Sequence, residues 1–190
     1  MGVFLLSKIS AAALLFMTLP LTLPALVLSR IIFGQALFFQ KRIGFLCKPF
    51  TIVKIRSLPL RENPGLRTHN LGHSASAYSK ILRLSKVDEL VQLVNVLCGS
   101  MEIVGPRPGL EVDVELTSER LKRNCFAVKP GITGLSQVLG YSMNNPRNLA
   151  RIDKVYVNNA SWKLDALIIV ATVFSLFGFR TIARGLIILS

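Results

Sequence analysis

Residues 85–108 read SKVDELVQLVNVLCGSMEIVGPRP, and the rest of the chain can be interpreted outward from this stretch. Apolar residues recur at helical spacing through its first half, which predicts a helix with one apolar face. We expect Ser85 to cap the start of this helix and Gly99 to end it. Two adjacent acids, Asp88 and Glu89, then lie in the first turn, where negative charge complements the positive end of a helix.

The composition points to a membrane surface or to an anionic ligand. The chain has 190 residues, with 23 Lys and Arg against 10 Asp and Glu, a formal net charge of +13 and 51% hydrophobic residues. A soluble basic protein is seldom this apolar, so we expect a lipid surface, a phosphate ligand, or both. The three cysteines are scattered without metal-ligand spacing, which predicts a reduced cytoplasmic setting (Cys47, Cys98 and Cys125).

Residues 9–29 carry no charged side chain and allow three interpretations. A straight helix of this length, at about 1.5 Å per residue, would cross a bilayer. A secretory signal is less favoured, because the segment is long and no clear cleavage site follows. Pro20 and Pro24, with basic residues on both flanks, favour a helix–break–helix hairpin that re-enters the cytoplasmic face. Thr18 and Thr22 are then expected to satisfy carbonyls that the prolines free.

The whole pattern predicts an α+β fold that is mainly helical. We expect few short strands, a re-entrant membrane helix and interfacial amphipathic helices. Residues 1–40 would form the membrane hairpin and an interfacial segment, and residues 41–190 a cytoplasmic-face catalytic domain. The uncharged residues 166–179 are short for a membrane span, so we expect an interfacial helix within that domain.

Residues 50–57 alternate in character and are rich in β-branched side chains, so they predict a strand. Lys54 and Arg56 would then point to one side, either as a solvated basic edge or as a phosphate clamp. His69 and His73 have helical spacing, but Gly72 and the lack of a nearby acid argue against zinc. The remaining elements are expected to be a basic turn at residues 40–44, a charged exposed helix at 111–124, a Gly-rich turn at 129–134, a short strand or extended segment at 137–140 and a helix at 151–157.

The acidic pair Asp88–Glu89 is the strongest candidate site. Acids at a helix start most often cap the helix or lie in solvent. Here the chain is very basic, Arg83 lies just upstream, and Arg107 lies in the stiff GPRP turn. With Lys54 and Arg56 nearby, such a set could bind a diphosphate together with a divalent metal. One carboxylate would then be a nucleophile or metal ligand, and the other a metal ligand or base.

The order of motifs resembles that of the bacterial sugar transferase family, whose members are monotopic polyprenyl-phosphate phosphoglycosyl transferases. The central match is D-E-L-x-Q-L-x-N-V-L-x-G followed by I-V-G-P-R-P, at residues 88–99 and 103–108. Further matches occur in order from R-I-G through K-P-G-I-T-G-L-S-Q-V to S-W-K-L-D (residues 42–44, 49–57, 129–138, 153–157 and 161–165). The resemblance covers most of the chain, from about Pro24 to Val173.

This resemblance implies a transfer of sugar 1-phosphate from a UDP-sugar to undecaprenyl phosphate, with release of UMP, as the first membrane step of glycoconjugate synthesis. Asp88 would attack the sugar-linked phosphate and form a covalent phosphosugar intermediate. Glu89 would assist in metal binding or deprotonation, with Mg²⁺ held by both acids. Pro24 would break the membrane helix, and the enzyme would face the cytoplasm at the bacterial inner membrane. The substrate phosphates would be held by four basic residues (Lys54, Arg56, Arg83 and Arg107).

Several positions depart from the family pattern, but they spare the acidic pair. They include Lys86, Val91, Ser100, Glu102 and Tyr141, and they bear on substrate specificity and level of activity more than on reaction class. The alternative function is an inert membrane-associated scaffold of the same fold. A membrane-tethered nucleic-acid binder rests on charge alone, because the basic residues are not interleaved with aromatic residues as expected for binding single strands.

Overall fold

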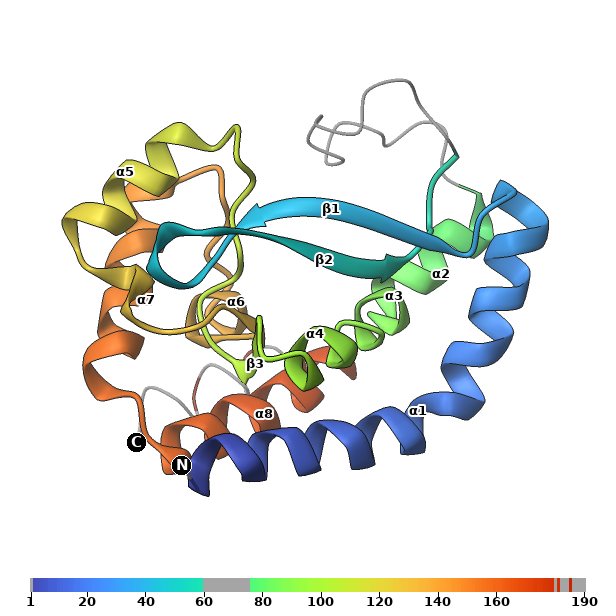
Figure 1. Ribbon diagram of the computed structural model, residues 1–190, viewed down its shortest axis with the longest axis horizontal. Helices are drawn as coiled ribbons and strands as arrows, with labels where there is room; N and C mark the ends of the chain where they lie inside the picture. Colours follow the sequence, from blue (N-terminus) through green and yellow to red (C-terminus); the bar gives the residue numbers. More distant parts are fainter. Residues whose placement is uncertain (1, 60–75, 180, 182–184, 186–190) are drawn as a thin grey trace. The chain divides into compact units, whose positions relative to one another are not determined.

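A computed structural model describes residues 2–59, 76–179, 181 and 185. The chain divides into two compact units, one formed by residues 1–41 and 51–98 and the other by residues 42–50 and 99–190. Helices outnumber strands in the described elements, and the strands are short (Figure 1). The predicted α+β, mainly helical fold class is therefore confirmed. The expected boundary near residue 40 concerns membrane placement and stays a prediction.

The first unit begins with α1, Gly2–Phe33, a helix that contains Pro20 and Pro24. Figure 1 shows that α1 bends sharply near its middle, as expected where prolines interrupt the helical hydrogen bonds. Residues Ser7–Phe33 are long and apolar enough to cross a membrane by length and composition. Because the helical assignment is continuous through the bend, the re-entrant hairpin stays a prediction.

The threonines near these prolines do not behave as expected. A proline frees the carbonyl four residues before it, which here means residues 16 and 20. The Thr18 hydroxyl instead donates to the Leu14 carbonyl at 2.8 Å, and the Thr22 hydroxyl donates to the Thr18 carbonyl at 3.1 Å. The predicted role of these hydroxyls is therefore wrong, since each one bonds back along its own turn of helix.

The part of α1 after the prolines is anchored to its own unit. Tyr78, on α2 (Ala77–Leu84), donates its hydroxyl to the Ala25 carbonyl at 2.6 Å. Ser29 is fully buried and its hydroxyl donates to the Arg56 carbonyl at 2.8 Å. Ala25 also belongs to a small apolar cluster with residues from the neighbouring elements (Ile55, Leu82 and Val91). These contacts hold the end of α1 against α2 and the end of the neighbouring strand.

The predicted strand at residues 50–57 is confirmed as β2, Pro49–Ile55, which pairs with β1, Leu37–Ile43. The basic turn predicted at residues 40–44 is wrong, because β1 continues through Ile43. The chain reverses later, around the short helix η1 (Phe45–Cys47), where the Gly44 amide donates to the Lys48 carbonyl at 2.9 Å. Pairing with β2 keeps the basic residues of this segment in extended conformation.

The central stretch is not the single helix that its periodicity predicts. Ser85 ends α2 as its C-cap, and its hydroxyl donates to the Leu82 carbonyl, so the predicted N-cap is wrong. Lys86 then adopts a left-handed conformation (φ 60°), and α3 (Val87–Leu90) and α4 (Leu93–Leu97) follow as separate short helices. Gly99, with φ +80°, follows the last of these helices, as the sequence predicts.

In the second unit, β3 (Glu102–Val104) pairs in parallel with β4 (Gly131–Thr133). The Gly-rich turn predicted at residues 129–134 is therefore wrong. Residue 131 must be a glycine because the backbones of β3 and β4 approach closely there. A Cβ on Gly131 would lie 2.1 Å from the Gly105 nitrogen. Residues 137–140 are not the predicted strand either, since α6 occupies Leu135–Val138.

Three longer helices complete the second unit: α5 (Val114–Lys122), α7 (Pro146–Asn159) and α8 (Trp162–Leu176). All three confirm helices predicted from the sequence, and the interfacial position predicted for residues 166–179 stays a prediction. On α8, Ile168 and Ala171 are fully buried in a core with residues of β3, α6 and α7 (Val104, Leu135, Val138 and Tyr156). The other side of α8 exposes Val170, Val173 and Phe174, so one helix has an apolar face in the core and an apolar face outside it.

Candidate active site

The structure places the acidic pair in a buried, cationic environment within the first unit. Asp88 and Glu89 lie on α3, and each is only 7% exposed. Lys54, on β2, forms an ion pair with Glu89, with 2.6 Å between Nζ and Oε1. The predicted approach of Lys54 to the acids is therefore confirmed, although the two residues are far apart in the chain.

Asn95, on α4, holds β2 in the position that this ion pair requires. Its Oδ1 accepts from the Val53 amide at 3.1 Å, and its Nδ2 donates to the Thr51 carbonyl at 2.8 Å. The side-chain amide thus bonds to one edge of β2 as a neighbouring strand would. The next residue after Val53 is Lys54, so Asn95 fixes the backbone beside the ion pair. Asn95 belongs to the central motif, but sequence reasoning assigned it no role.

The electrostatics of Asp88 are unusual for an aspartate. Burial raises the pKa of Asp88, and the neighbouring Glu89 charge raises this pKa further. Lys54, Lys86 and Arg83 act in the opposite direction and lower it. Asp88 Oδ1 is buried and has no hydrogen-bond partner among the described residues. Asp88 therefore carries one buried carboxylate oxygen without a hydrogen-bond partner among the described residues, and the charges of Lys54, Lys86 and Arg83 favour its ionised form.

The predicted basic residues of the first unit divide into two groups. Arg83 acts on Asp88, as expected, and so does exposed Lys86, which the sequence marked only as a departure from the family pattern. Arg56 is not among the charges that shift the pKa of Asp88. Its Nη2 donates to Gln35 Oε1 at 2.8 Å, and its guanidinium lies 5.5 Å from the ring centre of Phe38. The phosphate-binding role of Arg56 stays a prediction.

Two further predicted site residues lie elsewhere. Arg107 belongs to the second unit, where its carbonyl accepts from Arg120, and its role toward the acidic pair stays a prediction. Pro24 lies within α1, and its role as the membrane break also stays a prediction. His69 and His73 lie outside the described residues.

The acidic pair offers the kind of ligand that Mg²⁺ takes in proteins. Among the described residues, no group of three or more His, Cys, Asp or Glu is arranged to hold a metal. Mg²⁺ is commonly bound by one or two carboxylates together with substrate phosphates. Asp88 Oδ1, buried and without a hydrogen-bond partner among the described residues, is a suitable ligand atom beside Glu89. The residues present therefore fit a magnesium ion that arrives with a diphosphate.

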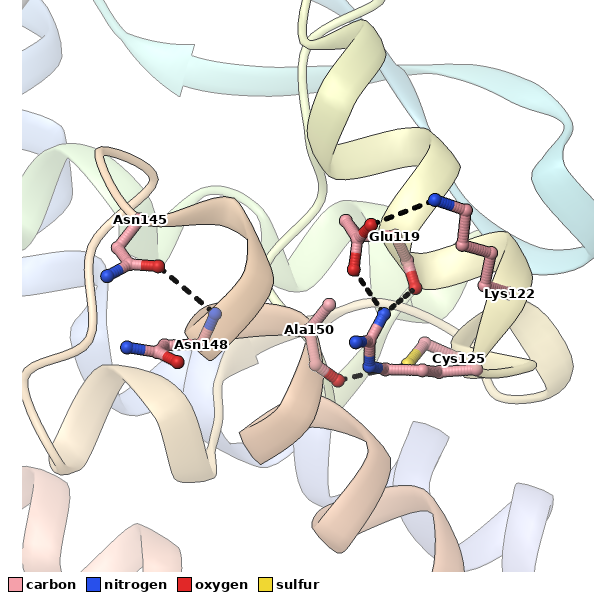
Figure 2. A network of polar contacts seen from close by, with 7 residues as sticks. Glu119, Lys122, Cys125, Asn145, Asn148 and Ala150 are labelled. Atoms are coloured by element: carbon pink, nitrogen blue, oxygen red, sulfur yellow. Dashed lines mark hydrogen bonds and ion pairs between the residues drawn. The ribbon is translucent and has the colours of Figure 1, made fainter.

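A second set of polar contacts involves α5, α7 and the residues that follow α5, and it has a structural character (Figure 2). Glu119 is 7% exposed and bonds to Lys122 and Arg123, whose hydrogen bonds lower the pKa of its carboxyl. The Cys125 thiol donates to the Ala150 carbonyl, and burial raises its pKa to about 11. A thiol of this kind is not a nucleophile at neutral pH. The predicted exposure of the charges of residues 111–124 is therefore wrong for three of them, which are buried (Asp113, Glu119 and Arg120).

Comparison with known proteins gives consistent matches. The family model described as bacterial sugar transferase matches residues 4–178. The chain is 36% identical over 183 residues to a UDP-glucose:undecaprenyl-phosphate glucose-1-phosphate transferase of Caulobacter vibrioides, covering 90% of this chain and 68% of the relative. It is also 36% identical over 169 residues to the uncharacterized sugar transferase EpsL of Bacillus subtilis, covering 86% and 81%.

Longer relatives match over part of their length. A UDP-N-acetylgalactosamine-undecaprenyl-phosphate N-acetylgalactosaminephosphotransferase of Aeromonas hydrophila is 33% identical over 159 residues, which cover 80% of this chain and 36% of the relative. The match likewise spans 33% of the length of a UDP-glucose:undecaprenyl-phosphate glucose-1-phosphate transferase of Escherichia coli.

Proposed function

Because the chain belongs to the bacterial sugar transferase family, we propose that it transfers a sugar 1-phosphate from a UDP-sugar to undecaprenyl phosphate and releases UMP. The names of several relatives support this reaction, since they share the undecaprenyl-phosphate acceptor and a UDP-sugar donor. The donors that these names give differ in the sugar, so the proposal extends to a UDP-sugar without choosing one. The observation that carries the proposal is the buried Asp88–Glu89 pair among three cations.

In the first step, an Asp88 carboxylate oxygen attacks the sugar-linked phosphorus of the UDP-sugar. The bond between this phosphorus and the bridging oxygen breaks, and UMP leaves with the electron pair of that bond. The product is a covalent phosphosugar on Asp88. Asp88 Oδ1 has no hydrogen-bond partner among the described residues, so no such bond has to break before the carboxylate acts as a nucleophile.

Negative charge must approach negative charge in this step, so cations are required. Lys54 and Arg83 are proposed to hold the donor phosphates beside Asp88, because both already act on its charge. Arg56 and Arg107 are proposed as further phosphate-binding residues. Glu89, held by Lys54 at 2.6 Å, is proposed to share the metal ion with Asp88 or to accept a proton. When bound, Mg²⁺ would offset the charge of the diphosphate.

In the second step, a phosphate oxygen of undecaprenyl phosphate attacks the phosphorus of the covalent intermediate. The Asp88 oxygen–phosphorus bond breaks, the carboxylate is regenerated, and the sugar diphosphate of undecaprenol is formed. The covalent intermediate replaces one difficult displacement with two easier ones.

The first prediction tests the reaction itself. Purified protein supplied with a panel of UDP-sugars, undecaprenyl phosphate and Mg²⁺ is expected to release UMP with at least one donor. Release should depend on the polyprenyl phosphate for repeated turnover and should stop when EDTA removes the metal. If no donor yields UMP while the lipid and metal are present, the inert scaffold is the better account.

A second prediction concerns the membrane. We propose that α1 re-enters the cytoplasmic face at Pro24 and that the active site faces the cytoplasm of the inner membrane. In a background without other cysteines, Val3→Cys and native Cys47 are each expected to react with an impermeant maleimide only from the cytoplasmic side. Reaction of the residue 3 cysteine from the outside would show that α1 spans the bilayer, and protein solubilised in detergent is the control for accessibility.

A further inference from the structure

In the second unit, the turn that carries Arg107 is held through its backbone carbonyls. Neither Pro106 nor Pro108 has an amide hydrogen, so backbone hydrogen bonds can hold these residues only through their carbonyls. Each carbonyl from residue 106 to residue 109 accepts one bond: Gly131 N to Pro106 O at 3.1 Å, Arg120 Nη1 to Arg107 O at 2.8 Å, Arg42 Nη1 to Pro108 O at 3.1 Å, and Ile43 N to Gly109 O at 3.0 Å.

Arg120 differs from the other donors because it is a charged side chain buried without access to solvent. Arg120 is 2% exposed and Asp153, its partner on α7, is 1% exposed. The Arg120 Nε and Nη2 atoms both donate to Asp153 Oδ2, at 2.9 Å and 2.6 Å. This fork fixes the plane of the guanidinium, and it leaves Nη1 directed at the Arg107 carbonyl.

Stability alone is a weak reason to bury such a pair. Desolvation offsets most of the Coulombic gain of a buried ion pair, and well-packed apolar side chains often serve as well. What an apolar pair cannot supply is a directed donor to the carbonyl of one chosen residue. Here that residue is Arg107, the only residue between the two prolines of the turn.

We propose that Arg120 is a positioning residue for Arg107, with Asp153 orienting the Arg120 guanidinium. The inference rests on the proposed function, in which Arg107 binds substrate phosphate. Arg120 is buried, so it acts through the Arg107 backbone and does not contact the substrate. Asp153 orients the Arg120 guanidinium, and Arg120 holds the Arg107 carbonyl. The rigid turn then determines the direction of the Arg107 side chain.

A double-mutant cycle between Arg120 and Arg107 tests this proposal. Arg120→Lys retains the positive charge beside Asp153 but loses the planar fork that reaches both partners. We expect Arg120→Lys to lower kcat/KM for the UDP-sugar by about tenfold in the native background, since small misplacements of a binding group are costly. In the Arg107→Ala background the same change should lower kcat/KM by less than about twofold, because the group being positioned is gone.

The matched control is Arg123→Lys, on the same helix, because Arg123 pairs with Glu119 and not with the turn. Arg123→Lys should have the same small effect in both backgrounds. Equal losses from Arg120→Lys in both backgrounds would mean that Arg120 supports the fold alone, and the proposal would be wrong. Should Arg120→Lys fail to fold, Asp153→Glu completes the same cycle, because it moves the carboxylate that orients Arg120.

The same double-mutant cycle is also measured as the affinity of each variant for UDP, because UDP binding requires no turnover. Arg107→Ala should weaken UDP binding, and Arg120→Lys should weaken it only when Arg107 is present. If Arg107→Ala leaves both UDP affinity and UMP release unchanged, the positioning proposal falls while the proposed reaction stands. If UDP affinity follows the expected cycle but no donor yields UMP, the reaction is wrong and the positioning role is retained.

Discussion

Replacing Asp88 with asparagine is expected to abolish turnover, with UMP release falling at least about a thousandfold, as expected when a covalent nucleophile is removed. Protein incubated with a UDP-sugar labelled in the sugar or its attached phosphate should acquire label when native and none when Asp88 is replaced. The physical reason is that an amide oxygen is neutral and far less nucleophilic than a carboxylate, whereas its shape is nearly the same.

The melting temperature distinguishes the loss of activity in Asp88→Asn from misfolding. Burial and Glu89 raise the pKa of Asp88 above its unfolded value, so folding disfavours the ionised form. The unfolded chain loses this proton at lower pH than the folded chain does. Stability is therefore reduced as pH rises through that interval, and it stays reduced at neutral pH. Asp88→Asn removes the penalty, so the melting temperature in detergent at pH 7 should be unchanged or higher.

The matched control is Glu111→Gln, which neutralises an exposed acid of the second unit. It should retain both turnover and labelling. If Asp88→Asn keeps near-native turnover, or still acquires the phosphosugar label, Asp88 is not the nucleophile. A lower melting temperature for Asp88→Asn at pH 7 would contradict the electrostatic account of the site.

The second large effect is expected from Lys54→Met, which keeps the length of the side chain and removes its charge. Glu89 would lose the ion pair that it makes at 2.6 Å, with side chains only 15% and 9% exposed. Removing one partner of a buried pair typically costs about 3–5 kcal/mol. Loss of a cation beside the transferred phosphate should also lower kcat about a hundredfold or more, comparable to removal of an electrostatic stabiliser in other enzymes. UMP release and thermal unfolding measure the two effects.

The pH dependence of kcat/KM provides an independent signature. Lys54 lowers the pKa of Asp88, so its removal should raise that pKa further. Because the attacking group must be ionised, the acidic limb of kcat/KM should move to higher pH in Lys54→Met. Lys86→Gln is the comparison, since Lys86 also lowers this pKa but is exposed. We expect the same direction of shift with little loss of rate at the optimum. Acidic limbs that coincide in the native protein and both variants would show that Asp88 does not control the profile.

Local features were predictable where neighbours in sequence are also neighbours in space. The alternation of residues 50–57 predicts β2, and Gly99 predicts the end of α4, because strand pleating and left-handed backbone are local properties. The prediction of one helix from Ser85 to Gly99 was wrong. Apolar spacing reports which positions are buried, but it does not report where a helix is interrupted. Lys86 adopts a left-handed conformation between α2 and α3, and Val91 and Gln92 separate α3 from α4.

Long-range pairing was less predictable. The charges of α5 looked solvated, because a charged side chain is usually exposed unless a partner is buried with it. Arg120 has such a partner in Asp153, on another helix, and no spacing rule connects the two. The same limit applies to Gly131, where a side chain would collide with the backbone of Val104 and Gly105 on the neighbouring segment.

By itself, the sequence determined the family, the acidic pair and the proline-containing apolar helix, because these are properties of residue identity and order. The tertiary structure decided which cations serve the acids. Lys54 reaches Glu89 across the fold, Lys86 joins Arg83 beside Asp88, and Arg56 pairs elsewhere. The physical reason is that a carboxylate's pKa and reactivity depend on burial and on charges within a few ångströms, and those are set by packing between segments distant in sequence.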